Sequence, residues 1–410
     1  MTDKIIDADE GLARADAAAS ANAGRLSIVL SLGFCHLLND MMQSMVPALY
    51  PILKDGYRLD FAQIGLITLT FEATASLLQP AIGYWADRRP AAYALPIGMS
   101  FTFAGLILLA TASSYPMILA AAAMIGVGSS VFHPEASRVA RMASGGKYGR
   151  AQSLFQLGGN LGSATGPLLA AFVVVPRGQA SITWFSIAAL VAIAVLTAVG
   201  NWYVRNRPSP AARHSGRAVT LSLSRRRITF ALAIMLALIF SKTFYWASLG
   251  SYYTFYLMAK FEISVQLAQM ALFVFLAAYV VGTLAGGWIA DKVGYVQVIW
   301  FSILGALPFT LALPYAGLTL TVVLSVAVGL IMASSFSAML VYAQELLPGR
   351  VGMVAGLFFG LSFGLGAIGA AALGKLADLT SIETVYVVCS YLPAIGLLAV
   401  FLPRTGRERS

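Results

Sequence analysis

Charged side chains are scarce in this chain of 410 residues: Asp, Glu, Lys and Arg make up 11% of it, whereas hydrophobic residues make up 59%. Soluble domains carry about 25% charged residues. A water-soluble fold of this length would have too few charges to cover its surface, whereas positions that face lipid need none. The composition therefore excludes an ordinary soluble protein and predicts an all-α membrane protein.

Cysteine is almost absent, and two other common signals are missing. Cys35 and Cys389 both lie in apolar runs, which excludes a disulfide framework and a zinc-binding cysteine pattern. The glycine-rich segment 158–166 contains no lysine, so it is not a nucleotide-binding loop and ATP-driven transport is disfavoured. Residues 1–24 lack the basic flank and apolar run of a secretory signal, and we expect a disordered cytoplasmic tail there.

Apolar segments long enough to cross a bilayer recur along the whole chain. A membrane-spanning helix needs about 20 apolar residues. Twelve segments meet this requirement, near residues 26–53, 61–86, 92–113, 116–142, 150–175, 181–203, 228–259, 265–290, 295–315, 319–346, 350–377 and 382–403. The predicted organisation is a tail (1–24), a six-helix bundle (25–203), a cytoplasmic linker (204–227), a second six-helix bundle (228–404) and a tail (405–410).

Positive charges are distributed unevenly between the connections. The linker 204–227 is rich in arginine and has no acidic residue, and most of the 27 lysines and arginines fall in connections on the same side. Cytoplasmic connections of membrane proteins carry such an excess, so both termini are predicted to be cytoplasmic. The same asymmetry accounts for the net charge of +10, and no nucleic-acid partner is needed to explain it.

Two related motifs indicate that the chain consists of duplicated halves. GYWADRR at 83–89 corresponds to GWIADKVG at 287–294, and segment 149–167 aligns loosely with 352–370 at nearly the same offset. The shared pattern G-x-x-A-D-[RK] resembles the signature that the major facilitator superfamily carries between spans two and three, with an echo between spans eight and nine. The resemblance implies two bundles around a central cavity that opens to each side in turn.

The acidic residues of these motifs are predicted to act as gates. Asp87 and Asp291 each end a span and are followed by Arg88 and Lys292. A carboxylate at a helix end can meet a basic side chain or the positive N-terminus of a neighbouring helix, and such a contact would hold one face of a transporter closed. Glu345, at the end of the tenth span, is expected to form an ion pair at the cytoplasmic end and is counted with the gate.

The predicted fifth span carries a glycine motif with two interpretations. GSATGPLLAA at 162–171 resembles the G-x-x-x-G-P-x-x-G-G motif of drug–proton antiporters, although its last pair is Ala170-Ala171. This resemblance favours an antiporter over an importer. Close packing of helices through small residues explains the same glycines without antiport, so both interpretations stay open.

Ionisable side chains at membrane depth are the candidates for proton coupling. Each costs about 2.5–3.5 kcal/mol at a helix centre, so they usually face a cavity or each other. His36 and Asp40 share one face of the first span, Glu72 lies in the second, and His133 and Glu135 lie in the fourth. A carrier needs a carboxylate that desolvation makes easier to protonate. Asp40 and Glu135 rank first, because each has a histidine nearby that can relay the proton; the alternative for any one of these residues is a satisfied packing contact.

A lysine, Lys242, lies near the middle of the predicted seventh span. Its charge needs a partner, which is either a carboxylate or the substrate itself. The other predicted substrate-binding residues are polar and belong to the same cavity: Arg138, Tyr245, Tyr252, Tyr253, Gln156, Asn160 and Asn39. No metal site is predicted, because His133 and Glu135 have no second histidine close by in the sequence. A membrane-embedded enzyme that uses them is disfavoured for the same reason.

Several longer stretches carry a closer resemblance. They are 36–51, 63–71, 76–87, 128–146, 251–258 and 342–350, and HPEASRVARMASGG within 128–146 is the most specific of them. These stretches resemble the branch of bacterial exporters that confer resistance to the phosphonate antibiotic fosmidomycin. The resemblance implies an inner-membrane exporter that trades a proton for a small anionic antibiotic, with the proton gradient in place of a cofactor, and we expect a monomer. The alternative on the same fold is a proton-coupled importer of a sugar or organic acid.

Overall fold

The computed structural model describes residues 25–46, 49–59, 61–206 and 224–403. Within these ranges the chain is helical and contains no strand, which confirms the predicted all-α class. The expected tails at 1–24 and 405–410 and most of the expected linker lie outside the described residues.

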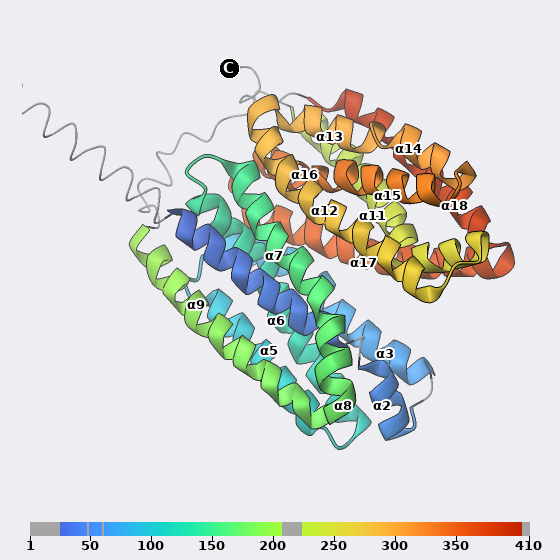
Figure 1. Ribbon diagram of the computed structural model, residues 1–410. Helices are drawn as coiled ribbons and strands as arrows, with labels where there is room; N and C mark the ends of the chain where they lie inside the picture. The colour runs from blue at the N-terminus through green and yellow to red at the C-terminus, as the bar shows by residue number, and fades with distance from the viewer. Residues whose placement is uncertain (1–24, 47–48, 60, 207–223, 404–410) are drawn as a thin grey trace, which may run out of the picture.

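The helices form two bundles, one from each half of the sequence (Figure 1). The N-terminal bundle begins with a helix over residues 25–46 and continues with α2 (Tyr50–Tyr57), α3 (Phe61–Glu72), η1 (Ala73–Leu77), α4 (Gln79–Arg88), α5 (Ala94–Thr111), α6 (Tyr115–Ala143), α7 (Tyr148–Leu169), η2 (Ala170–Val174), α8 (Val175–Arg177), η3 (Gln179–Trp184) and α9 (Phe185–Asn206). The C-terminal bundle consists of α11 (Arg225–Phe261), α12 (Val265–Val293), α13 (Tyr295–Leu304), α14 (Leu307–Ala312), η4 (Leu313–Tyr315), α15 (Leu318–Ala333), α16 (Ser335–Leu346), α17 (Val351–Leu379), α18 (Ile382–Ser390) and η5 (Leu392–Phe401). Because α9 continues to Asn206 and α11 begins at Arg225, helix extends a few residues into both ends of the expected linker.

Nine helices in the described residues are long and apolar enough to span a membrane. The three remaining predicted spans are built from shorter pieces: the helix 25–46 with α2, α3 with η1 and α4, and α7 with η2 and α8. Both η1 and η2 are π-helical turns, and each precedes a helix with proline in its first turn, Pro80 or Pro176. Proline lacks the N–H that would continue the preceding helix. The arrangement is consistent with twelve spans.

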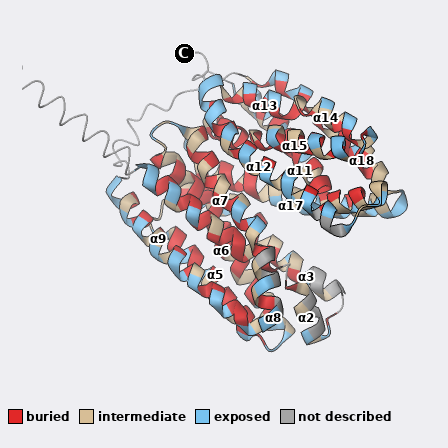
Figure 2. Cartoon of the chain, viewed as in Figure 1, coloured by how far each residue is buried: buried red, intermediate tan, exposed pale blue. Residues whose placement is uncertain are grey.

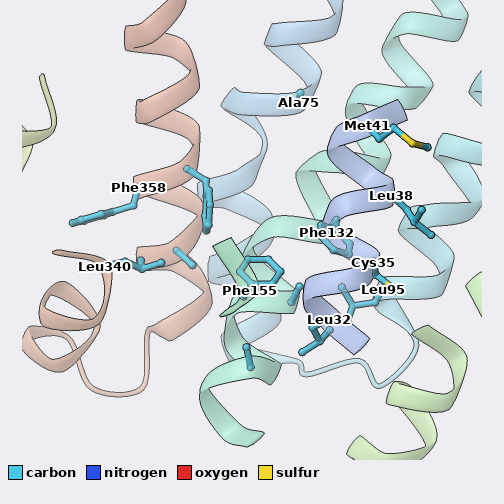
Figure 3. Packing of buried hydrophobic residues seen from close by; sticks show 14 of the residues in the cluster. Leu32, Cys35, Leu38, Met41, Ala75, Leu95, Phe132, Phe155, Leu340 and Phe358 are labelled. Carbon is cyan, nitrogen blue, oxygen red and sulfur yellow. The ribbon is translucent and has the colours of Figure 1, made fainter. Parts of the chain in front are cut away.

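Exposed residues lie on the outer surface of both bundles, whereas the helix faces that pack together are buried (Figure 2). Leu69 and Phe172 are 62% and 74% exposed, a state that suits contact with lipid hydrocarbon. Leu32, Phe155 and Phe358 belong to one buried cluster, part of which is drawn in Figure 3. Because Phe358 comes from α17, this cluster continues from the N-terminal bundle into the C-terminal one.

The bundles contact each other through two sets of helices. α17 packs against α4 and α6, and α7 packs against α12 and α16. Glycine allows the close approach: a Cβ on Gly83 would overlap the backbone of Gly352, and one on Gly149 would lie 2.7 Å from the Gly287 carbonyl oxygen. These contacts lie toward the ends of the helices that border the linker, whereas the opposite ends of the bundles diverge (Figure 1).

Candidate transport site

The side chains of His36, Asp40 and His133 meet inside the N-terminal bundle. His36 and Asp40 lie one turn apart on the helix 25–46, where residues i and i+4 share a face, and His133 comes from α6. His36 Nε2 is 3.3 Å from Asp40 Oδ2, and His133 Nε2 is 3.4 Å from Asp40 Oδ1. Asp40 is 6% exposed and both histidines are 0% exposed. The sequence placed His36 beside Asp40, but only the fold brings His133 to the same carboxylate.

Backbone carbonyls set the protonation pattern of both imidazole rings. His36 Nδ1 lies 2.8 Å from the Phe155 carbonyl oxygen, and His133 Nδ1 lies 3.1 Å from the Ser129 carbonyl oxygen. A carbonyl only accepts, so each Nδ1 carries a hydrogen and donates it. In the neutral rings each Nε2 then has a lone pair that faces the carboxylate. Without a further proton, each Nε2 faces a carboxylate oxygen of Asp40 as one acceptor faces another, and the space between them therefore offers a place for a proton.

Side chains from both bundles enclose the cluster. Asn39, which was predicted to bind substrate, donates from Nδ2 to Asp40 Oδ1 over 3.0 Å. The rings of Phe359 and Phe363 lie against His133, with centroid distances of 5.0 and 5.4 Å. Both phenylalanines belong to α17, so the cluster lies directly against the other half of the molecule.

The glycine-rich part of α7 makes room for the cluster. A Cβ on Gly159 would overlap the His36 ring and lie 2.9 Å from Asp40 Oδ2, and a Cβ on Gly162 would overlap the Leu37 carbonyl. Small-residue packing, one of the two interpretations of this motif, is therefore present in the structure. Gly159 was not among the residues predicted from the sequence, where its only signal is a glycine on a helix that was expected to pack closely.

The other two candidate carboxylates lie apart from this cluster. Glu135 Oε2 accepts from Arg138 Nη2 over 2.6 Å, and Arg138 Nη1 donates to the Tyr203 hydroxyl over 3.0 Å. Glu72 Oε2 accepts from Ser76 Oγ over 3.0 Å, at the start of the π-helical turn η1, and such turns are frequent at functional sites. Glu135 and Arg138, which were predicted to serve the proton and the substrate separately, neutralise each other in this structure.

A buried cation lies in the C-terminal bundle. Lys242 on α11 is 5% exposed. Its Nζ donates to Ser335 Oγ of α16 over 3.0 Å and lies 5.6 Å from the centre of the Phe336 ring. The ion pairs of the described residues do not include Lys242. The sequence left two partners open for Lys242, a carboxylate or the substrate. A carboxylate partner is not found among the residues that the structure describes.

Aromatic side chains surround a small cavity beside this lysine. Tyr245, Trp246, Phe275 and Tyr279 line it together with Lys242, and the ring centres of Trp246 and Tyr279 are 4.3 Å apart. Only Tyr245 was predicted. Trp246 adjoins it in the sequence, whereas Tyr279 comes from α12 and nothing in its local sequence connects it to Lys242.

Several predicted substrate-binding side chains make other contacts. Tyr252 donates to a backbone carbonyl of α17 over 2.6 Å, and Tyr253 donates to a serine of α15 over 3.0 Å; neither lines the cavity beside Lys242. Gln156 donates to Asn160 over 3.3 Å, and Asn160 donates to Thr283 of α12 over 3.1 Å. Asn160 therefore bridges the two bundles in this structure.

The two motif aspartates each bind the start of a helix in the opposite bundle. Asp87 accepts from both N–H groups of Gly352–Met353 over 2.9 Å, at the beginning of α17. Asp291 accepts from those of Gly149–Arg150 over 2.9 and 2.8 Å, at the beginning of α7. The first N–H groups of a helix have no partner within it, and the helix dipole favours negative charge there. The sequence allowed either a basic side chain or a helix N-terminus as the partner of each aspartate. In the structure the partner is the helix N-terminus.

The remaining predicted gate residues lie at the periphery, and a neighbouring glutamine makes the contact between bundles. Arg88 and Lys292 are exposed, and Glu345 is half-buried near the end of α16. Gln344 is buried, and its Oε1 accepts from Arg141 Nη1 of α6 over 3.1 Å. The sequence analysis missed Gln344, since an amide beside a glutamate carries no distinct pattern.

One family model matches the chain in two stretches, which correspond roughly to its two halves. The sequence model of the Major Facilitator Superfamily matches residues 32–256 and again 235–410. The chain belongs to this superfamily. It is therefore a multi-pass membrane transporter and not an enzyme, as the sequence predicted.

Two relatives match the chain over nearly its whole length. It is 56% identical over 395 residues to the fosmidomycin resistance protein of Escherichia coli strain K12, with 95% of this chain and 96% of that protein covered. It is 42% identical over 390 residues to an uncharacterized MFS-type transporter of Bacillus subtilis strain 168, with coverages of 93% and 94%. The first match confirms the resemblance found in the sequence.

Solved structures with the same architecture are more distant in sequence. The MFS transporter FucP in the outward conformation superposes with a TM-score of 0.72 at 15% identity, covering 94% of this chain and all of that one. The proton:xylose symporter XylE superposes with a TM-score of 0.69 at 14% identity, covering 94% and 98%. At such identities the similarity shows the fold alone.

Proposed function

We propose that this protein is a proton-coupled antiporter that exports small anionic compounds, fosmidomycin among them, across the bacterial inner membrane. The observation that carries the proposal is a pair of buried charged sites: Asp40 between two histidines in one bundle, and Lys242, which has no carboxylate partner among the described residues, in the other. The identity of 56% to a protein named for fosmidomycin resistance supports the choice of substrate.

Lys242 is the proposed anchor for the substrate's anionic group. A charge-assisted hydrogen bond between an ammonium and an oxyanion is stronger than one between neutral groups, and the attraction increases in a site of low dielectric constant. In this structure the Nζ group donates to Ser335 Oγ, which fixes its position. The side chains of Tyr245 and Tyr279 line the same cavity, and these residues are the proposed additional donors.

Asp40 is the proposed proton carrier, and His36 and His133 are its relay. A proton that enters the cluster bonds between an imidazole Nε2 and the carboxylate, where only acceptors otherwise face each other. The contact of His133 with Phe359 and Phe363 of α17 gives a direct physical route from the charge of the cluster to the position of the other bundle. Glu72 and Glu135 are the further carboxylates whose removal tests this assignment.

The bonds of Asp87 and Asp291 are the proposed cytoplasmic lock. The excess of positive charge in the connections on that side supports cytoplasmic termini. With this orientation, the two aspartates close the inner face in this structure, and the diverging ends of the bundles open outward. In the proposed cycle the substrate is released first, and Asp40 is protonated next. The transporter then changes to the opposite state, in which both carboxylate–helix contacts are broken.

Direction of transport gives the decisive experiment. Expression in a sensitive bacterium should raise its tolerance of fosmidomycin. In inside-out membrane vesicles with an acidic lumen, an antiporter accumulates the drug as protons leave, whereas a proton-coupled importer drives it out. Unchanged tolerance with membrane-inserted protein would contradict the substrate, and expulsion from acidified vesicles would support the importer instead.

A further inference from the structure

A pocket lined by positive charge lies where the helix 25–46 begins. It has a volume of about 410 Å³ and lies between this helix, the turn that precedes α7, and α7 itself. Its basic lining residues are Arg25, Lys147 and Arg150. An adjoining cavity of about 480 Å³ shares Arg25 and adds Arg138 and Arg141. No acidic residue lines either cavity in the described part of the chain, so the pocket is suited to an anion.

Arg150 supplies a second observation that indicates a ligand. Its guanidinium lies over the Trp288 ring at 4.1 Å, and its Nε is buried without a hydrogen-bond partner among the described residues. Buried N–H groups nearly always have an acceptor, and a guanidinium is well shaped to bind phosphate oxygens. The ion pairs of the described residues do not include Arg150, so its charge is left for an anion such as a phosphate.

The pocket also has an apolar part. Leu26, Val29 and Leu154 line it beside the cations. From its edge, Leu26, Leu30 and Phe34 continue along the same helix at intervals of four residues, and they are 40%, 51% and 45% exposed. Residues at this spacing form one stripe on a helix. A ligand with an anionic head and hydrocarbon chains would match both parts, whereas a free phosphate would match only the first.

We propose that this basic pocket binds the phosphate of an anionic phospholipid, with the acyl chains along Leu26, Leu30 and Phe34. Basic pockets at the ends of membrane helices are a common form of lipid recognition. The lipid is held by Arg25, Lys147 and Arg150 at the first turn of α7. Since the N–H groups of Gly149–Arg150 also bind Asp291, a bound lipid stabilises the start of α7 in the position that closes this face.

Thermal unfolding of the full-length protein in detergent tests the proposal, with tryptophan fluorescence as the readout. Phosphatidylglycerol should raise the midpoint by roughly 2–4 °C, since a ligand that binds only the folded state stabilises it. Phosphatidylcholine with the same acyl chains should have little effect, because it lacks the net negative charge. Equal shifts with the two lipids, in the wild-type protein alone, would overturn the proposal without any variant.

Charge removal locates the site. Arg25→Gln with Lys147→Gln should lose at least half of the shift caused by phosphatidylglycerol. The matched control is Arg225→Gln with Arg226→Gln, which removes two charges from exposed residues at the start of α11 and should keep the shift. Arg25→Lys with Lys147→Arg retains both charges and should also keep it, even if the glutamine pair folds poorly. The same shift in the glutamine pair and the control would contradict the assignment.

Soluble anions separate the lipid from other sources of the same chemistry. Inorganic phosphate and fosmidomycin, each at millimolar concentration, should not reproduce the shift, because neither supplies hydrocarbon for the apolar side of the pocket. A full shift with inorganic phosphate would show a free-anion site and overturn the lipid assignment. A shift with fosmidomycin that the Arg25 and Lys147 variants abolish would show that the pocket belongs to the drug.

Discussion

The two bundles hold their buried charges in opposite ways, although their gates are alike. Asp40 has two histidines and an asparagine around it, whereas Lys242 has one hydroxyl and aromatic rings. A carboxylate surrounded by imidazoles can exchange protons with its own neighbours, whereas a cation that has no carboxylate partner among the described residues leaves its charge available to an anion that enters. In the proposed function each half has one lock, whereas the ion sites of the two halves serve different ions, a proton in one and an anion in the other.

Removing the charge of Asp40, in the N-terminal bundle, should have the largest effect on transport. Asp40→Asn keeps the size of the side chain and removes the titrating group, so gradient-driven accumulation in vesicles should be abolished while drug exchange partly survives. Asp378→Asn, which changes an exposed residue at the far end of α17, is the matched control and should transport normally. Undiminished accumulation in both Asp40→Asn and Glu135→Gln would show that neither carboxylate carries the proton.

Removing the charge of Lys242, in the C-terminal bundle, should act first on the binding of the drug. Lys242→Ala should weaken fosmidomycin binding roughly 10–150-fold, since a hydrogen bond to a charged group contributes about 1.5–3 kcal/mol, and tolerance should disappear at equal protein level. Lys375→Ala removes an exposed lysine and should bind the drug normally. Full tolerance of the drug with Lys242→Ala would leave the substrate assignment intact but would show that Lys242 does not bind the substrate.

Substitution of either lock residue, Asp87 or Asp291, should have the same effect, whereas substitutions of Asp40 and Lys242 should have different effects. Asp87→Asn and Asp291→Asn should each reduce turnover by about tenfold, because each weakens charge-assisted bonds that stabilise one state, while drug affinity changes little. Turnover and equilibrium binding measured on both variants check this. A large loss of affinity at normal turnover would place either aspartate in the binding site.

Glycines of the two bundles should differ in their tolerance of a methyl group. Gly159→Ala should lower the stability by about 1–3 kcal/mol, the usual cost of overpacking, because its Cβ meets His36. Gly366→Ala on α17, where nothing lies within 4 Å of the added atom, should be neutral or stabilising by up to about 1 kcal/mol. Thermal unfolding of both variants measures the difference, and equal midpoints would contradict the tight packing around the proton site.

The smallest effect is expected at Tyr253, where sequence and structure differ. Tyr253→Phe removes a bond to a serine of α15 and should cost about 0.5–1.5 kcal/mol of stability with no change in drug affinity. Binding measurements decide between the two assignments: a loss as large as that of Lys242→Ala would restore Tyr253 to the substrate site, as the sequence predicted.

Fold and family were predictable from the sequence because the bilayer imposes simple rules on a chain. Long apolar runs must be helical to satisfy their backbone groups, and charge bias orders the connections. Duplication was visible because Asp87 and Asp291 lie in matching motifs. Residues on one helix face, such as His36 and Asp40, could likewise be grouped by their spacing of four.

Contacts between helices that are distant in sequence were decided only by the tertiary structure. His133 could not be separated from Glu135 by spacing, yet packing turns it toward Asp40 and leaves Glu135 to Arg138. Tyr252 and Tyr253 adjoin the face of Lys242 in the sequence, but their hydroxyls are taken up by α17 and α15. Sequence spacing determines which side chains share a face of one helix, whereas the close packing of neighbouring helices determines what that face meets.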